Sequence, residues 1–139
     1  MKKYMFLLIA LLITSVFVMA DETRYINALK NCSSYSESGS VSSDGVTANS
    51  TKQVKGWQGD KCTYVENVNF GGITANVTCK FTKPQLQEIT SVMDAYLLTL
   101  KYSEEHVDTS SVEAVQNNPI VKVWNKYIQD SNVCTIEAQ

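Results

Sequence analysis

Segment 61–81 constrains the fold most strongly, because its apolar and polar residues alternate with a period of two on both sides of Phe70-Gly71. Such alternation is typical of antiparallel strands with one face on a core and the other in solvent. A hairpin folded at Phe70-Gly71 places Cys62 opposite Cys79. Its apolar face then carries Cys62, Tyr64, Val68, Ile73, Ala75, Val77, Cys79 and Phe81, and its polar face carries Lys61, Thr63, Asn67, Thr74, Asn76, Thr78 and Lys80.

The first 20 residues predict export. Lys2 and Lys3 form a basic start, residues 5–18 are mostly apolar, and Val18-Met19-Ala20 supplies a cleavage site before Asp21. An uncleaved membrane anchor is the weaker reading, because Thr14-Ser15 interrupts the run and a span needs about 20 apolar residues. We therefore expect a bacterial type of signal peptide over 1–20, a single small α+β domain over 21–139, and a secreted or periplasmic protein.

The charge pattern argues against several classes of partner. Removal of Lys2 and Lys3 leaves 10 basic and 14 acidic residues, a net charge of −4. The remaining lysines are scattered, so no basic stripe is present for nucleic acid and no basic helix for a membrane surface. We expect no cofactor, no nucleic-acid partner and no membrane span after cleavage, whereas a protein or a small polar ligand is compatible with the sequence.

All four cysteines lie after the predicted signal peptide, which indicates two disulfides formed in an oxidising compartment. Four cysteines allow three connectivities, and the sequence leaves all three open. The hairpin register favours Cys62–Cys79, which leaves Cys32–Cys134 to tie the two ends of the domain together. Neither a redox C-x-x-C pair nor zinc-ligand spacing is present, so the cysteines are expected to be structural.

Two further turns predict a four-stranded antiparallel meander. Asp44-Gly45 is a favourable two-residue hairpin turn, and folding there pairs Val41 with Ala48, Glu37 with Lys52, and Tyr35 with Val54. A three-residue loop at Gln58-Gly59-Asp60 then pairs Gly56 with Cys62, Val54 with Tyr64, and Lys52 with Glu66. A two-residue Gly59-Asp60 turn would instead direct Val54 to the polar face.

Helices are predicted on both sides of the meander. Residues 21–32 carry a short apolar stripe, and Thr82 with Gln85 forms a capping box that opens a helix over 82–101. Ser110 with Glu113 opens a short helix, and Asn118-Pro119 opens a last one, followed by a tail pinned by Cys134. The predicted fold is α+β and disulfide-stabilised: a short N-terminal helix, a four-stranded antiparallel meander, and two to three C-terminal helices on one sheet face. This arrangement loosely resembles cystatin-like folds, although no family motif is present.

The predicted register aligns Glu37, Lys52 and Glu66 across three strands on the face assigned to the core. Buried charges without partners are costly, so either these side chains satisfy one another or the helices leave the row open. An open row would be a binding groove or simply a solvated end of the sheet, and a different register would separate the three residues. Trp57, in the glycine-flanked tip Gly56-Trp57-Gln58-Gly59, is a second binding candidate, since an exposed indole can stack on a sugar or anchor a protein. The alternative for Trp57 is that it folds back over its own hairpin.

Evidence for catalysis is limited to His106, the only histidine, which lies among Glu104, Glu105 and Asp108. Imidazole can act as a base or a metal ligand, but no nucleophile or metal motif accompanies it, and a solvated acidic loop is the favoured explanation. Asn31, Asn49 and Asn76 begin N-x-S/T sequons whose use the sequence leaves open.

We therefore expect a non-enzymatic binding, inhibitor or envelope interaction module. A small hydrolase using His106 and a structural subunit of an extracellular assembly are the alternatives, and the oligomeric state is left open.

Overall fold

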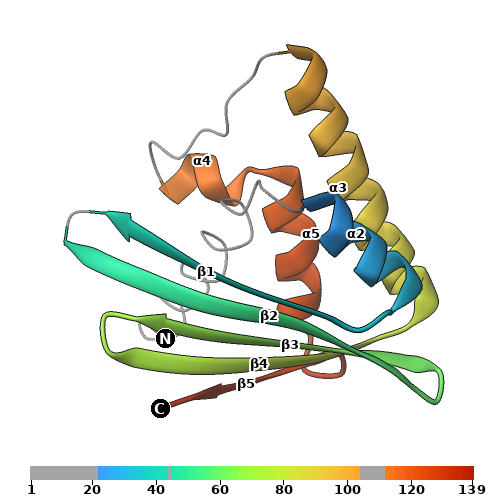
Figure 1. Ribbon diagram of the computed structural model, residues 1–139, viewed down its shortest axis with the longest axis horizontal. Helices are drawn as coiled ribbons and strands as arrows, with labels where there is room; N and C mark the ends of the chain where they lie inside the picture. The colour runs from blue at the N-terminus through green and yellow to red at the C-terminus, as the bar shows by residue number, and fades with distance from the viewer. Residues whose placement is uncertain (1–21, 44, 104–111) are drawn as a thin grey trace.

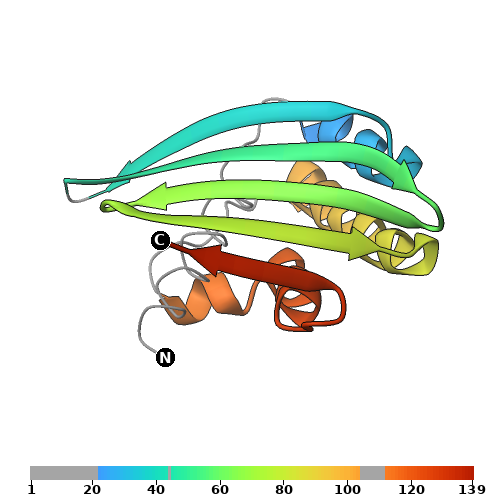
Figure 2. The same cartoon turned by 90° about the horizontal axis from the view of Figure 1, so that it is seen from below.

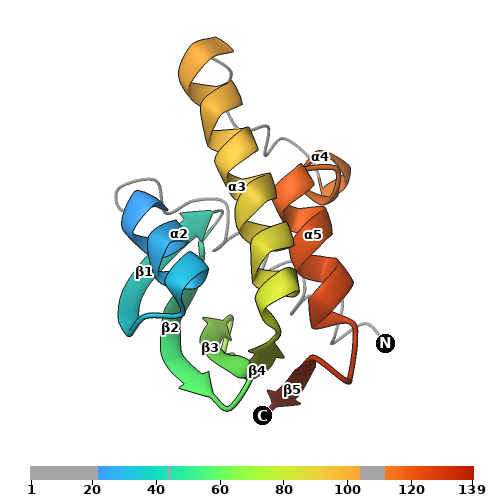
Figure 3. The same cartoon turned by 90° about the vertical axis from the view of Figure 1, so that its right-hand side faces the viewer.

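The computed structural model describes residues 22–43, 45–103 and 112–139. Within them, one antiparallel sheet has the strand order β1-β2-β3-β4-β5, and the helices lie on one side of it (Figures 1 and 3). The elements are α2 (Glu22–Asn31), β1 (Tyr35–Ser43), β2 (Val46–Gln58), β3 (Lys61–Phe70), β4 (Ile73–Phe81), α3 (Lys83–Ser103), α4 (Val112–Gln116), α5 (Pro119–Ile128) and β5 (Cys134–Ala138). The predicted signal peptide, His106 with its carboxylates, and Ser110 of the second capping box lie outside the described residues.

The mixed α+β class with two disulfides is confirmed, but the prediction of four strands is wrong. The C-terminal segment that we expected as a tail forms β5 and pairs with β4. Backbone hydrogen bonds between Thr74 and Gln139 continue this pairing to the last residue. A fifth strand satisfies backbone groups along β4 that would otherwise form an open sheet edge.

The register of the first hairpin is confirmed. Tyr35 pairs with Val54, Glu37 with Lys52, and Val41 with Ala48. The serine-rich segment is therefore a strand, because its partners on β2 supply the buried residues of the shared inner face.

The register of the β3–β4 hairpin is shifted by two residues from the prediction. Cys62 pairs with Phe81 and Tyr64 pairs with Cys79, so the predicted pair of Cys62 with Cys79 is wrong. The turn is Gly71-Gly72, where both residues have positive φ, 55° and 84°. A two-residue hairpin turn with two positive φ angles favours glycine at both positions, which explains why the chain turns one residue later than expected.

The β2–β3 connection also differs from the predicted three-residue loop. Gln58 pairs with Lys61 across the two-residue turn Gly59-Asp60, and Trp57, not Gly56, faces Cys62. A register shift between Val54 and Gly56 inserts one extra residue into β2. This bulge restores the pairs that the longer loop was expected to give, Val54 with Tyr64 and Lys52 with Glu66.

The disulfides are Cys32–Cys62 and Cys79–Cys134, so the preferred pairing of Cys62 with Cys79 and Cys32 with Cys134 is wrong. Cys79 lies directly opposite Cys134 on β5, with 4.1 Å between their Cα atoms. Cys32 directly follows α2 and lies 5.9 Å from Cys62, Cα to Cα. One bridge therefore joins α2 to the sheet, and the other joins β4 to its edge strand.

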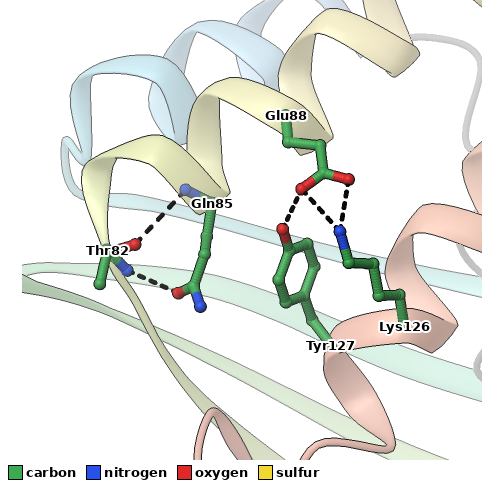
Figure 4. Close-up of polar contacts among 5 residues, drawn as sticks. All are labelled: Thr82, Gln85, Glu88, Lys126 and Tyr127. Atoms are coloured by element: carbon green, nitrogen blue, oxygen red, sulfur yellow. Dashed lines mark hydrogen bonds and ion pairs between the residues drawn. The ribbon is translucent and has the colours of Figure 1, made fainter.

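The helix ends use the caps that the sequence predicts. Thr82 N–H donates to Gln85 Oε1 (2.8 Å), and Gln85 N–H donates to Thr82 Oγ1 (3.4 Å), which confirms the capping box before α3 (Figure 4). Asn118 Oδ1 accepts from Ile120 N–H (2.9 Å), with Pro119 opening α5. At the end of α2, Cys32 has a φ of 47°, and Ser33 N–H donates to Ala28 O (3.0 Å), the geometry of a Schellman cap.

The core lies between the helices and the inner face of the sheet. α2, α3 and α5 stand side by side over this face (Figure 3). An aromatic group at its centre joins β3 and β4 to α5, with Tyr64 5.1 Å from Trp124 and Phe81 5.8 Å from Trp124 between ring centroids. The buried apolar side chains include Ile26, Leu29, Val54, Val68, Val77, Leu86, Ile89, Met93, Ile120 and Val123.

We predict that C32A/C62A lowers the free energy of unfolding by roughly 3–4 kcal/mol and C79A/C134A by about 4 kcal/mol, because each bridge closes a long loop in the unfolded chain. Urea unfolding followed by circular dichroism measures both values.

The single variant C32A tests the connectivity. Thiol alkylation and mass spectrometry should find Cys62 as its free thiol, with Cys79–Cys134 intact. A free Cys134 in C32A would instead support the pairing favoured by the sequence and contradict the structure.

Candidate functional site

The charged row predicted from the sequence is present on the inner face of the sheet. Lys52 pairs with Glu37 on one side and with Glu66 on the other. Lys52 is only 3% exposed and Glu66 2%, whereas Glu37 is half-buried. The three residues therefore lie on one face and on neighbouring strands, as the register predicts, and Lys52 and Glu66 lie inside the protein.

A hydrogen-bond relay links this row to helix α2. The Tyr25 hydroxyl donates to the Tyr64 hydroxyl (3.2 Å), which in turn donates to Glu66 Oε2 (2.9 Å). A buried carboxylate is tolerated where such donors replace water. Tyr25 on α2, Tyr64 on β3 and the Glu66 side chain thus form one continuous polar path through the core.

The other two charged residues of the row each contact a tyrosine, Lys52 through its ring and Glu37 through its hydroxyl. Lys52 Nζ lies 5.2 Å from the centroid of the Tyr25 ring, within the range of a cation–π interaction. The Tyr35 hydroxyl donates to Glu37 Oε2 (3.2 Å), and the Tyr35 ring lies 5.8 Å from that of Tyr25. Of the two arrangements that the sequence left open, the contacts support an enclosed polar network, and the binding role of Glu37, Lys52 and Glu66 stays a prediction.

Burial controls the ionisation of the two relay tyrosines. Desolvation raises the pKa of Tyr25 and of Tyr64 well above the usual value, and the negative charge of Glu66 raises both further. Both phenols therefore remain protonated at neutral pH and act as hydrogen-bond donors. This network links α2 to the sheet through hydrogen bonds inside the core.

Trp57 occupies the tip of the β2–β3 hairpin and is 43% exposed. It lies opposite Cys62, whose disulfide to Cys32 fixes this end of the hairpin to the end of α2. The indole is therefore partly free to contact a partner from a braced strand end, although its role in binding is untested.

The outer face of the sheet forms a second candidate site, of which the sequence predicts only the polar character. Figure 2 views the molecule from this side, with the strands in front of the helices. The register aligns its side chains in rows across the strands. The three central rows are Ser40, Asn49, Asn69, Thr74 and Gln139; Ser38, Thr51, Asn67, Asn76 and Glu137; and Ser36, Gln53, Val65, Thr78 and Thr135.

Hydroxyl and amide groups dominate these rows. Glu137 is their only charged side chain and Val65 their only apolar one. Neighbouring groups hydrogen-bond across the strands, with Ser38 Oγ 3.0 Å from Thr51 Oγ1 and Asn69 Nδ2 3.2 Å from Thr74 Oγ1. We call these three rows the outer polar face. Alternation along each strand predicts their polarity, but their alignment over five strands requires the registers and β5.

The outer polar face ends in a cationic corner beside the β2–β3 turn. Thr63 pairs with Gly56 on one side and Lys80 on the other, and Lys61 is two residues away on the same strand face. Thr63 is only 7% exposed, and its Oγ1 has no hydrogen-bond partner within the described part of the chain. The glycine opposite Thr63 leaves one side of this position without a side chain.

A surface cluster ties α3 to α5. Lys126 Nζ contacts both oxygens of Glu88 at 2.7 and 3.0 Å, and the Tyr127 hydroxyl donates to the same carboxylate (Figure 4). These hydrogen bonds, led by that from Lys126, lower the pKa of Glu88. Glu88 and Lys126 are exposed, whereas the Tyr127 side chain is buried. The ion pair is therefore a surface tie between the two helices and contributes little stability.

No group of three or more metal-ligating side chains occurs in residues 22–43, 45–103 and 112–139. None of the helices within the described ranges is long and apolar enough to cross a membrane.

The chain matches no protein-family model, no curated protein and no solved structure.

We predict that Y64F lowers the free energy of unfolding by roughly 1–3 kcal/mol, because Glu66 loses a buried donor and the Tyr25 hydroxyl loses its acceptor. Y35F is the matched control at a half-buried tyrosine, and we expect a loss of less than about 1 kcal/mol there. Chemical unfolding measures both values, and equal losses in the two variants would contradict a special role for the relay.

We predict that E88Q lowers the Tm at pH 7 slightly, on the order of 1–3 °C. Since the pKa of Glu88 is lowered in the folded protein, its stabilising effect is complete above the ordinary value of 4.5 and disappears as the pH falls through the folded pKa. The Tm values of wild type and E88Q should therefore converge in acid. K126Q should lower the Tm by the same amount, and the double variant E88Q/K126Q should lose no more than either single variant. Additive losses in the double variant would exclude the Glu88–Lys126 pair as the cause.

Proposed function

We propose that the protein is an exported, non-enzymatic binding module and that its outer polar face binds a neutral, hydroxyl-rich ligand of the polysaccharide class. The observation that carries this proposal is the near absence of charge from three aligned rows of serine, threonine, asparagine and glutamine. Charged residues form 19% of the chain, which would place about three among these fifteen positions, whereas Glu137 is the only one present.

The chemistry of the face selects among ligand classes. Hydroxyl and amide groups both donate and accept hydrogen bonds, as do the hydroxyl groups of a sugar. Nucleic acids and anionic lipids require cations, which the three rows lack. A protein partner that gains affinity by burying apolar surface would find only Val65 here. A flat, extended and neutral glycan chain is the partner that uses most of the groups present.

The scaffold supports binding by limiting the motion of the face. Cys79–Cys134 joins β4 to β5, and Cys32–Cys62 joins β3 to α2. Side-chain pairs such as Ser42 with Thr47, 2.9 Å apart, reduce rotamer freedom before any ligand arrives. A surface that is ordered in advance loses less entropy on binding.

Export is part of the proposal. The predicted signal peptide supports it, and two disulfides among the four cysteines favour an oxidising compartment outside the bacterial cytoplasm. A secreted or periplasmic protein of this kind would meet envelope or extracellular glycans.

A second candidate function is protein binding through Trp57. Its 43% exposure on a disulfide-braced hairpin supports this alternative, since tryptophan is enriched among residues that anchor protein interfaces. The hydrolase alternative depends on His106 and stays a prediction outside the described residues. The alternative of an assembly subunit would require contacts between copies at an edge of the sheet.

We predict that the wild-type protein co-sediments with at least one of cellulose, chitin and starch granules, and that N67D weakens this binding at least tenfold. Asn67 lies exposed at the centre of the face, and aspartate keeps its shape while removing the amide donors and adding a charge. N27D is the matched control, since Asn27 is exposed on α2.

Two results would refute the glycan proposal. One is that the folded wild-type protein binds none of the three polymers. The other is that N67D and N27D bind equally well. Loss of binding in W57A together with full binding in N67D would transfer the site to the hairpin tip.

A further inference from the structure

Strand β1 forms one edge of the sheet, and it is long and regular. All nine of its residues pair with β2 without interruption, from Tyr35 with Val54 to Ser43 with Val46. Within the described residues no strand pairs with its other side (Figure 2). An edge of this length presents a row of backbone donors and acceptors that can template another strand.

Most of the devices that usually protect an edge are missing from β1, and an inner-face charge, Glu37, is the one present. Its sequence, YSESGSVSS, contains no lysine, arginine or proline, and its pairing with β2 contains no bulge. Its one charged side chain, Glu37, belongs to the inner face and accepts from Tyr35. The opposite edge, β5, is only five residues long and carries Glu137. The two edges therefore differ in how open they are to pairing.

We propose that β1 pairs antiparallel with β1 of a second copy of this chain, forming a two-fold dimer with one continuous ten-stranded sheet. Gly39 is the central residue of the strand, and a two-fold axis there places Ser38 opposite Ser40 of the second copy and Ser36 opposite Ser42. Serine then faces serine along the outer side. This repeats the hydroxyl pairs that β1 already makes with β2, Ser38 with Thr51 and Ser42 with Thr47.

The inner side of the strand is also compatible with this register. Gly39 faces its own copy at the axis, where two side chains would otherwise meet. Glu37 takes the position opposite Val41 of the second copy, so the two acidic residues do not face each other. A register displaced by one residue would direct the serines of one copy toward the inner side of the other.

A second copy fits better than an unrelated extended peptide for a reason of symmetry. Serine occupies every even position from 36 to 42, so the strand is complementary to itself in the antiparallel direction. An isologous contact also closes after two copies, which prevents open-ended assembly. This inference is independent of the glycan proposal, because it rests on the edge and not on the outer polar face.

Sedimentation equilibrium of the full-length exported protein, recovered from the producing host over a range of concentrations, tests the dimer. We expect a concentration-dependent mass up to twice that of the monomer for the wild type. S38K/S40K should weaken association at least tenfold, since lysines on both copies would face one another. Q87K/Q129K is the matched control, because it adds two lysines at exposed positions on α3 and at the end of α5, away from the β1 edge, and it should associate like the wild type.

The charge-swapped variant S38K/S40E tests the register. The two-fold axis at Gly39 places each introduced lysine opposite an introduced glutamate, so association should return to within about threefold of the wild type. A monomeric wild type throughout the range would overturn the proposal, as would a dimer that S38K/S40K leaves unchanged. A wild type that stays monomeric but binds a synthetic peptide of unrelated extended sequence would assign the edge to a different partner.

Discussion

The structure depends on keeping a side-chain period of two in register across five strands. The tight turn at Gly59-Asp60 would by itself direct Val54 and Lys52 to the outer face. The length of the turn decides whether the even-numbered or the odd-numbered residues of β2 face inward, and we call this choice the parity of the strand. The extra residue between Val54 and Gly56 restores that parity. The buried charged row and the outer polar face therefore both depend on one bulge, since a slip of one residue would exchange them.

Parity also explains which features the sequence could predict. Alternation assigns each residue to a face, and the Asp-Gly sequence at positions 44–45 predicts the one register that the first hairpin has. Alternation predicts the β3–β4 turn one residue too early. The reason is that a shift of each pairing by two residues leaves every side chain on the same face of the sheet. Alternation alone cannot detect that shift, and only the preference of glycine for positive φ at both Gly71 and Gly72 distinguishes the two hairpins.

The prediction of the disulfide pairing was wrong for two reasons. One is that shift in register, and the other is that β5 is too short to be recognised from the sequence. Residues 134–138 contain a single strongly apolar residue besides Cys134, namely Ile136, so no alternation was evident there. Once β5 pairs with β4, Cys79 has a partner directly opposite, and Cys62 is left to the cysteine that ends α2. The candidate site was predictable in part. Aligning Glu37, Lys52 and Glu66 requires the registers of two strand pairs, whereas aligning the outer polar face requires the registers of four.

Polar groups are distributed over the two faces in opposite ways. On the inner face, Lys52 and Glu66 lie beneath helices and contact aromatic rings and hydroxyls, which penalises any register that separates them from Tyr25 and Tyr64. On the outer face, neutral groups impose no such penalty and repel no partner. The inner network can therefore fix the sheet while the outer face stays chemically permissive.

The proposed edge contact would act directly on binding. Pairing at β1 would extend the outer polar rows of one copy into those of the second, because both serine faces lie on the same side of the joined sheet. A long polymer that contacts one copy would then meet the second at a high effective concentration. Hydrogen-bonded glycan contacts without aromatic stacking are weak individually, so a doubled face offers a route to stable binding that needs no deeper pocket in either copy.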